Sequence, residues 1–275
     1  MRRLLFPAGL GVSALVGGAF LLLPLIALFT RVPLGRLLDQ LSRPVVTDAI
    51  VVSLKTTAIA QALVVVVGMP AAYLLATRRF PGRTLAITLI ELPLVLPPAV
   101  AGIGLLAAFG RVGLLGGTLG ALGWQIPFTQ AAVVLAVAFV ASPLFVRQAI
   151  AAFEGVDRTL VDASRTLGAG EARTFARVVV PLARTGLAAG AALGFARGLG
   201  EFGATIMFAG SLQGRTQTLP LAIYAEFDSN FDTALAIGGL LVVVSAALLL
   251  SLRLGSQWKR SGSTSAFRAA PSPSS

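Results

Sequence analysis

Long uninterrupted apolar runs are the feature that most limits how this chain can fold. A helix needs about 20 apolar residues to cross the hydrocarbon core of a bilayer, and only helices and closed barrels satisfy their backbone hydrogen bonds there. Because the runs are continuous rather than alternating, they predict helices. We therefore expect an all-α membrane protein with six transmembrane helices. The predicted spans cover about residues 1–30, 50–76, 85–109, 130–152, 182–209 and 232–254.

Two features modify this simple pattern. The third span contains Pro93, Pro97 and Pro98, and such a cluster interrupts the hydrogen-bond ladder, so we expect this helix to be kinked or discontinuous. The first apolar run is longer than the core of a signal peptide, and we expect it to be retained. The spans form a transmembrane domain over 1–254, and the Ser-, Pro- and Ala-rich residues 255–275 are expected to form a disordered tail.

The basic residues indicate topology. Of the 22 lysines and arginines, 15 fall on the side of the membrane that holds both termini, which predicts cytoplasmic termini. Since most of these residues lie beside spans, the net charge of +11 does not indicate a nucleic-acid partner. The chain contains neither cysteine nor histidine, so thiolate metal sites and the commonest general base are excluded. We expect no catalytic residue and no metal site.

Residues 153–181 separate the fourth and fifth spans and are called here the polar segment; they include residues 162–181, the longest charged segment of the chain. Apolar residues of the polar segment recur at intervals of four, three and four, which predicts a short helix with one apolar stripe. The stripe consists of Val156, Leu160, Ala163 and Leu167. One interpretation is an amphipathic helix that lies on the membrane surface. Another is a docking element for a partner protein.

The rest of the polar segment predicts a second short helix. Gly168 is placed to end the first helix, as C-terminal glycines do. Residues 171–179 then form the second helix, which leads to Pro181. Proline is tolerated in the first turn of a helix, so Pro181 is expected to begin the fifth span.

The spacing within the polar segment resembles the cytoplasmic EAA loop of ABC importer permeases. Asp162, Ala163 and Ser164 stand where that loop has Glu-Ala-Ala, and three residues lead to Gly168. Nine further residues lead to an aliphatic position, and the segment ends Val-Pro, at Pro181, where the family has Leu-Pro. The resemblance implies a type I ABC importer permease fold in which this coupling loop docks on an ATPase subunit. Leu160 and Leu167 would belong to the docking face.

Other stretches resemble the molybdate permeases of this family, and sulfate permeases are similar in the same places. They are residues 93–98, the Gly-Leu-Leu-Gly-Gly run from Gly113, and residues 127–129, 195–205 and 218–224. The resemblance implies import of molybdate across a prokaryotic cell membrane. Sulfate or thiosulfate and tungstate stay open as alternative substrates. An ATP-independent secondary transporter or channel is a more distant alternative, since it would have no use for the coupling loop.

The resemblance also implies partners. Two permease copies would form the pathway, two ATPase subunits would bind ATP and Mg, and an extracytoplasmic anion-binding protein would deliver the substrate. The sequence contains no Gly-x-x-x-x-Gly-Lys-Ser/Thr motif, so ATP hydrolysis is expected on a separate polypeptide. We therefore expect a non-catalytic subunit that binds no cofactor and is surrounded by lipid.

The fifth span has the most informative pattern within the membrane. Glycine recurs every four residues on one face, which predicts close packing against another helix. These glycines are Gly186, Gly190, Gly194 and Gly198. The adjacent row contains Arg197, Glu201 and Thr205. Arg197 and Glu201 are spaced to pair along a helix, and the pair is either structural or part of the translocation path or its gate.

Three other charged residues have simpler interpretations. Glu91 is expected to form an interfacial salt bridge with Arg83, rather than to act as a coupling carboxylate. Lys55 is expected to extend to the membrane interface, rather than to contact an anion. Arg147 is expected to meet lipid headgroups or carbonyl groups at a helix end.

Overall fold

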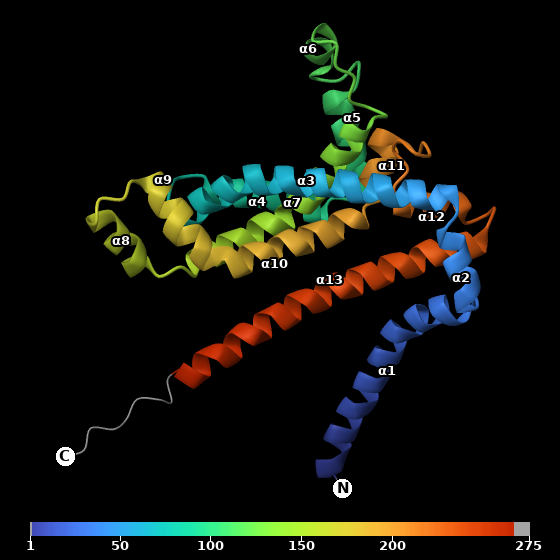
Figure 1. The fold of residues 1–275 in the computed structure, drawn as a ribbon, viewed down its shortest axis with the longest axis horizontal. Helices are drawn as coiled ribbons and strands as arrows, with labels where there is room; N and C mark the ends of the chain where they lie inside the picture. Colours follow the sequence, from blue (N-terminus) through green and yellow to red (C-terminus); the bar gives the residue numbers. More distant parts are fainter. Residues whose placement is uncertain (1, 267–275) are drawn as a thin grey trace.

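The computed structural model describes residues 2–266, with side chains described within residues 10–254 apart from 34, 252 and 253. All regular elements in the described range are helices (Figure 1). In chain order they are α1 (Arg2–Thr30), α2 (Leu34–Leu41), α3 (Pro44–Thr77), α4 (Arg83–Val95), α5 (Pro98–Phe109), α6 (Gly116–Ala121), α7 (Gln130–Glu154), α8 (Arg158–Thr166), α9 (Glu171–Thr174), the π-helical turn η1 (Phe175–Val179), α10 (Val180–Leu199), α11 (Gly203–Ala209), α12 (Leu219–Glu226) and α13 (Phe231–Ala266).

Within the described residues, five helical stretches are long and apolar enough to cross a membrane. They are Leu10–Thr30, Pro44–Thr77, Gln130–Glu154, Glu171–Leu199 and Phe231–Ser251. The pair α4 and α5 gives a sixth if it is counted as one span, although its two halves meet at a bend of 115°. The predicted all-α membrane fold is confirmed, and so is the discontinuous third span.

The bend between α4 and α5 follows from its prolines. α4 already contains Pro93, and Leu96 beyond its end is extended, as expected for a residue that precedes a proline. Pro98 then occupies the first turn of α5, where its missing N–H costs nothing. The chain therefore stops one helix and starts another in a new direction, and α5 points away from the bundle (Figure 1).

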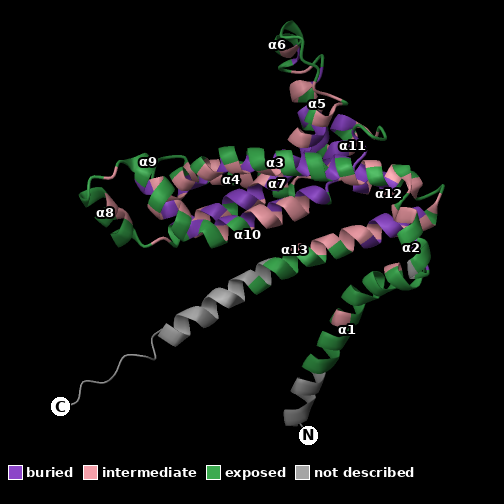
Figure 2. Cartoon of the chain, viewed as in Figure 1, coloured by how far each residue is buried: buried purple, intermediate pink, exposed green. Residues whose placement is uncertain are grey.

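The core surrounds α7, which packs against α3 on one side and α10 on the other. Small residues such as Ala132, Ala136 and Ala149 are fully buried on α7, and Phe145 fills the space between the helices. Figure 2 shows the buried residues concentrated along this bundle, whereas most of α1 is exposed. The N-terminal part of α13 packs against α2 and α12. The helices α3, α7 and α10 therefore form the packed core of the bundle.

The segments between the predicted spans contain more structure than the sequence indicated. The expected loops at 31–47, 110–129 and 210–231 include α2, α6 and α12, and α3 already begins at Pro44. α13 continues to Ala266, so residues 255–266 are helical where a disordered tail was expected. The remainder of that tail, 267–275, lies outside the described residues.

The fifth predicted span, 182–209, is not one helix. α10 ends at Leu199, and α11 starts at Gly203 after a short break. At the other end, the second helix of the polar segment continues without a gap through η1 into α10. The span is therefore displaced toward the polar segment, and the prediction of a continuous helix to residue 209 was wrong.

Candidate functional site

The first helix of the polar segment, α8, has well-defined ends. The Asp157 carboxylate accepts hydrogen bonds from the backbone N–H and the hydroxyl of Thr159, at 2.9 and 2.8 Å, which caps the N-terminus. These two bonds lower the pKa of Asp157 below its ordinary value of 3.8. At the other end, Gly168 adopts a left-handed conformation with φ of +81°.

The turn at Gly168 is a Schellman motif. The N–H of Gly168 donates to the Arg165 carbonyl at 2.9 Å, and the N–H of Ala169 donates to the Ser164 carbonyl at 3.1 Å. This pattern satisfies the last carbonyl groups of the helix, and it requires a left-handed residue at the position of Gly168. The chain therefore reverses sharply between α8 and α9.

The two faces of α8 have different surroundings. The side chains of Leu160, Ala163 and Leu167 are exposed, and Leu167 is 87% exposed. On the adjacent side of the helix, Val161 packs against the core and the Ser164 hydroxyl lies 3.1 Å from the hydroxyl of buried Thr174. The stripe is therefore exposed on a helix that is itself packed against the rest of the molecule, and such a surface suits a docking contact.

Two residues of the predicted coupling loop, Val156 and Asp162, do not lie on the exposed stripe. Val156 precedes α8 and packs against the core, so it does not continue the exposed stripe. Asp162 is exposed, and it lies on the side of α8 away from the stripe, facing the ends of α3 and α7.

Three aromatic rings join the polar segment to the bundle. Phe175 of η1 lies against Tyr73 of α3 and Phe153 of α7, with ring centroids 4.7 and 6.0 Å apart. Tyr73 and Phe153 also contact each other edge to face at 5.4 Å. Aromatic pairs in such geometries add stabilisation beyond the area they bury. This cluster was not predicted from the sequence, in which its one signal is Phe175 within an otherwise charged segment.

The π-helical turn η1 accommodates Pro181. Proline cannot donate a backbone hydrogen bond, and its ring collides with the carbonyl group four residues earlier in a regular helix. Here the N–H of Val180, just before the proline, donates to the Phe175 carbonyl in the wider π pattern. The widened turn lets the chain pass into α10 without a break. Pro181 lies in the first turn of α10, as predicted from the sequence.

Salt bridges link the polar segment and the end of α7 to the turn between α3 and α4. Arg78 pairs with Glu171 at 3.2 Å. Arg83 pairs with Glu154 at 3.0 Å and also donates to the Leu75 carbonyl at 2.7 Å.

The expected partner of Glu91 was wrong. Glu91 pairs instead with Arg147 of α7, at 3.1 Å. Arg83 is eight residues from Glu91, about 12 Å along a helix, whereas α7 lies alongside. Arg147 therefore has a carboxylate partner, where lipid headgroups or carbonyl groups were expected. Lys55 donates to the Gln130 side chain at 2.9 Å, at the start of α7.

The four glycines of α10 lie against neighbouring helices of the same chain. A Cβ atom at Gly186 or Gly190 would meet Ala152 or Gln148 of α7. A Cβ at Gly194 would meet Gln61 of α3, and one at Gly198 would meet both Val137 and Thr57. Gly190, Gly194 and Gly198 are buried. The glycine face therefore lies where α10 approaches α3 and α7.

Arg197 and Glu201 form an ion pair at 2.8 Å across the break that ends α10. The Glu201 side chain is only 1% exposed, whereas that of Arg197 is 35% exposed. The second carboxylate oxygen of Glu201 accepts the backbone N–H of Ala204 at 2.8 Å, so the same side chain holds the start of α11. Thr205 is fully buried in α11, and its hydroxyl has no partner among the described groups. Arg197, Glu201 and Thr205 were predicted to lie on one continuous helix. Instead, Arg197 lies in α10, Glu201 in the break and Thr205 in α11.

The break after α10 meets the break before α5. A Cβ at Gly203 would lie 2.6 Å from Pro98 Cβ, and α11 packs along α5. Irregular backbone at membrane depth is tolerated where it is buried in protein or lines a water-filled space.

Among the described residues, no group of acidic side chains has the arrangement of a metal site.

The chain is similar to known transport proteins. The family described as "Binding-protein-dependent transport system inner membrane component" matches residues 65–255. The molybdenum transport system permease protein ModB of Mycobacterium bovis is 44% identical over 250 residues, which cover 90% of this chain and 93% of that protein. The sulfate transport system permease protein CysT of Salmonella typhimurium is 36% identical over 259 residues, with coverage of 91% and 93%.

Solved structures share the fold. A bacterial ABC transporter involved in the import of the acidic polysaccharide alginate matches with a TM-score of 0.69 at 15% identity, covering 93% of this chain and 96% of that chain. The MetNI methionine ABC transporter, in an inward-facing conformation, matches with a TM-score of 0.56 at 21% identity, covering 74% and 91%.

Proposed function

The chain belongs to the family of binding-protein-dependent transport system inner membrane components, and we propose that it is the permease subunit of an ATP-driven molybdate importer. The observation that carries this proposal is the geometry of the polar segment. An exposed apolar stripe of Leu160, Ala163 and Leu167 is presented on a helix that is capped at both ends and anchored from behind. A soluble subunit that binds this stripe would act directly on the bundle.

The molybdate assignment rests on the curated relatives. The mycobacterial molybdenum permease is 44% identical over nearly the whole chain, and the molybdenum permease of Escherichia coli is 40% identical over 212 residues. The sulfate permease relative, at 36%, keeps sulfate as the second candidate. All three candidate anions, molybdate, tungstate and sulfate, are tetrahedral dianions, so their discrimination is assigned here to the external binding protein.

The proposal includes partners and an orientation. Two copies of the chain form the pathway, and each presents its polar segment to one ATPase subunit that binds ATP and Mg. A structure of the alginate transporter contains a periplasmic substrate-bound protein, which supports an external binding protein for this chain as well. The excess of basic residues on the terminal side supports cytoplasmic termini and a cytoplasmic polar segment. ATP is hydrolysed by the partner, and this chain supplies no catalytic group.

We propose a path by which force passes through the subunit. Movement of α8 reaches Phe175 and then α10, a helix of 20 residues and about 30 Å. The far end of α10 holds Glu201, which is bonded to the start of α11. α11 packs on α5, so displacement of α10 moves both helix breaks. We assign Arg197, Glu201 and Thr205 to the gate at this junction.

Reconstitution tests the proposal. The chain is placed in proteoliposomes with its ATPase, and ATP hydrolysis is measured with the binding protein loaded with molybdate, tungstate or sulfate. Stimulation by molybdate is expected. Stimulation by sulfate alone would contradict the substrate assignment, and no stimulation with any loaded binding protein would contradict the importer assignment.

A further inference from the structure

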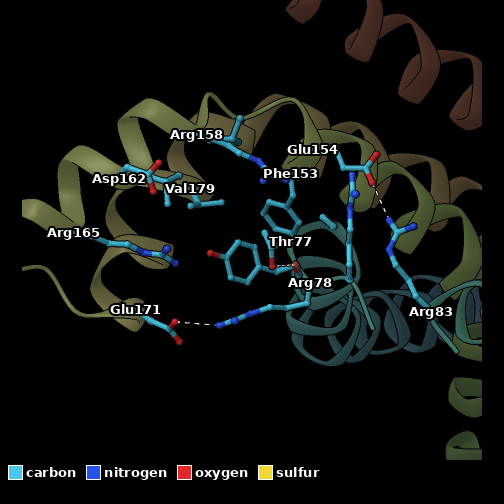
Figure 3. Close-up of a pocket in the computed structure, with 15 residues that line it drawn as sticks. Thr77, Arg78, Arg83, Phe153, Glu154, Arg158, Asp162, Arg165, Glu171 and Val179 are labelled. Atoms are coloured by element: carbon cyan, nitrogen blue, oxygen red, sulfur yellow. Dashed lines mark hydrogen bonds and ion pairs between the residues drawn. The ribbon is translucent and has the colours of Figure 1, made fainter. Parts of the chain in front are cut away.

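An arginine-rich hollow lies between the polar segment and the ends of the bundle helices. It has a volume of about 790 Å³ and is bounded by the end of α3, the turn before α4, the end of α7, and α8 (Figure 3). Tyr73 and Phe153 contribute aromatic surface. From α8 the lining includes Val161 and Asp162 rather than the exposed apolar stripe. A subunit docked on the stripe would therefore contact a different face of α8.

The hollow carries an excess of positive charge. Its lining has five guanidinium groups and three carboxylates. Two of the carboxylates are already paired, Glu171 with Arg78 and Glu154 with Arg83. Among the described residues, no salt bridge joins Arg79, Arg158 or Arg165 to a carboxylate.

The arrangement of these arginines favours one ligand chemistry. Figure 3 shows Arg158 and Arg165 extending into the hollow from α8, with Arg78 opposite them. Guanidinium groups present several N–H donors in a fixed plane, which suits the oxygens of phosphate-like groups. Like charges gathered in one concavity repel each other, and a bound anion removes that repulsion. The hollow also lies where α3 ends, at Thr77, and basic pockets between the ends of spanning helices suit anionic headgroups.

We propose that this hollow binds a phosphate-like tetrahedral oxyanion group, carried either by the headgroup of an anionic phospholipid or by a free inorganic oxyanion. The bound group contacts α8 on one side and the turn between α3 and α4 on the other. Its occupancy therefore fixes the position of α8 relative to the bundle. This binding activity goes beyond transport and does not require a partner subunit.

The test uses the purified, delipidated full-length chain in detergent. Native mass spectrometry compares the binding of added phosphatidylglycerol with that of added phosphatidylcholine. Equilibrium dialysis measures the binding of radiolabelled inorganic phosphate. The test variant is R158Q/R165Q, whose two arginines form none of the described salt bridges. The control is R111Q/R215Q, which removes the same charge from exposed positions outside the hollow. Circular dichroism and gel filtration verify that both variants keep the native fold.

We expect the wild type and the control to bind alike, and R158Q/R165Q to bind at least about tenfold more weakly, since each charged hydrogen bond lost costs about that factor. Selective retention of phosphatidylglycerol without phosphate binding identifies a lipid headgroup as the source. Binding of phosphate identifies a free oxyanion. The proposal is overturned if the wild type binds neither probe, or if R158Q/R165Q binds as the control does.

Discussion

Gly190 and Gly194 are equivalent in the sequence pattern, but their different neighbours predict different responses to alanine. A Cβ at Gly190 would lie 2.9 Å from Gln148 Cβ and 3.3 Å from the Phe145 carbonyl oxygen. Both atoms are fixed to the backbone of α7 and cannot rotate away. A Cβ at Gly194 would lie 2.7 Å from the Oε1 atom of Gln61, at the far end of a flexible side chain. We therefore expect Gly190→Ala to destabilise the protein and Gly194→Ala to be tolerated.

The size of the effect follows from two opposing terms. Carbon atoms in contact lie about 3.5–4.0 Å apart, so Gly190→Ala forces α10 and α7 to separate by several tenths of an ångström. Overpacking of this kind costs about 1–3 kcal/mol. Alanine is a better helix former than glycine by about 1 kcal/mol. Because both variants gain the same propensity, their difference in unfolding free energy isolates the packing cost, which we put at about 1–3 kcal/mol.

The measurement is the unfolding midpoint of each variant in detergent, by denaturant titration and by thermal melting. Gly104→Ala is the control, because a Cβ there meets nothing within 4 Å, and we expect it to be at least as stable as the wild type. If Gly190→Ala unfolded at the same denaturant concentration as Gly194→Ala, the argument that fixed atoms of α7 set the cost would be refuted.

Three further predictions concern the polar segment and the end of α10. Gly168→Val places a β-branched residue at φ of +81°, so we expect backbone strain of about 1–2 kcal/mol. In proteoliposomes, we expect this variant to hydrolyse ATP without matching uptake. Gly168→Asn should retain coupling, because asparagine tolerates the left-handed conformation. Arg197→Gln leaves the buried Glu201 carboxylate without its cation. We expect the free energy of unfolding, measured by denaturant titration, to fall by roughly 1–3 kcal/mol, a range already reduced for the partial exposure of Arg197. Adding Glu201→Gln should restore part of this loss. The lowered pKa of Asp157 means that its cap stabilises α8 at pH above the ordinary value of 3.8 and is lost as the pH falls through the lower folded value. The protection factors of the α8 amides, which are the intrinsic exchange rate at each pH divided by the observed rate, should fall over that acidic range in the wild type but not in Asp157→Asn, which caps without titrating.

Much of the polar segment could be predicted because its information is local. The stripe and the helix stop at Gly168 follow from spacing within a few residues, and the structure has a helix and a Schellman motif there. The spans could be predicted for a similar reason, since a bilayer imposes one length and one polarity on each helix. The proline cluster likewise marked the discontinuity between α4 and α5.

The end of α10 could not be predicted from the same patterns. The glycine repeat and the four-residue spacing of Arg197 and Glu201 both favour a continuous helix, and the ion pair does form. The chain nevertheless leaves the helix after Leu199, and the other oxygen of Glu201 accepts the backbone N–H of Ala204 at the start of α11. A carboxylate that serves two helices leaves no periodic signal. The partner of Glu91 was missed for a related reason, since the nearest basic residue in sequence is not the nearest in space.

The two hydrogen bonds of the Glu201 carboxylate limit how α10 and α11 can move relative to each other. One carboxylate oxygen is bonded to Arg197, near the end of α10, and the other is bonded to the backbone at the start of α11. A rotation of α10 must therefore either carry α11 with it or break a hydrogen bond to a buried charge, which costs about 1.5–3 kcal/mol. Carrying α11 along keeps that hydrogen bond, and α11 in turn lies against α5. We therefore propose that the break acts as a constrained hinge, which is what the proposed transmission from α8 to the proposed gate would require.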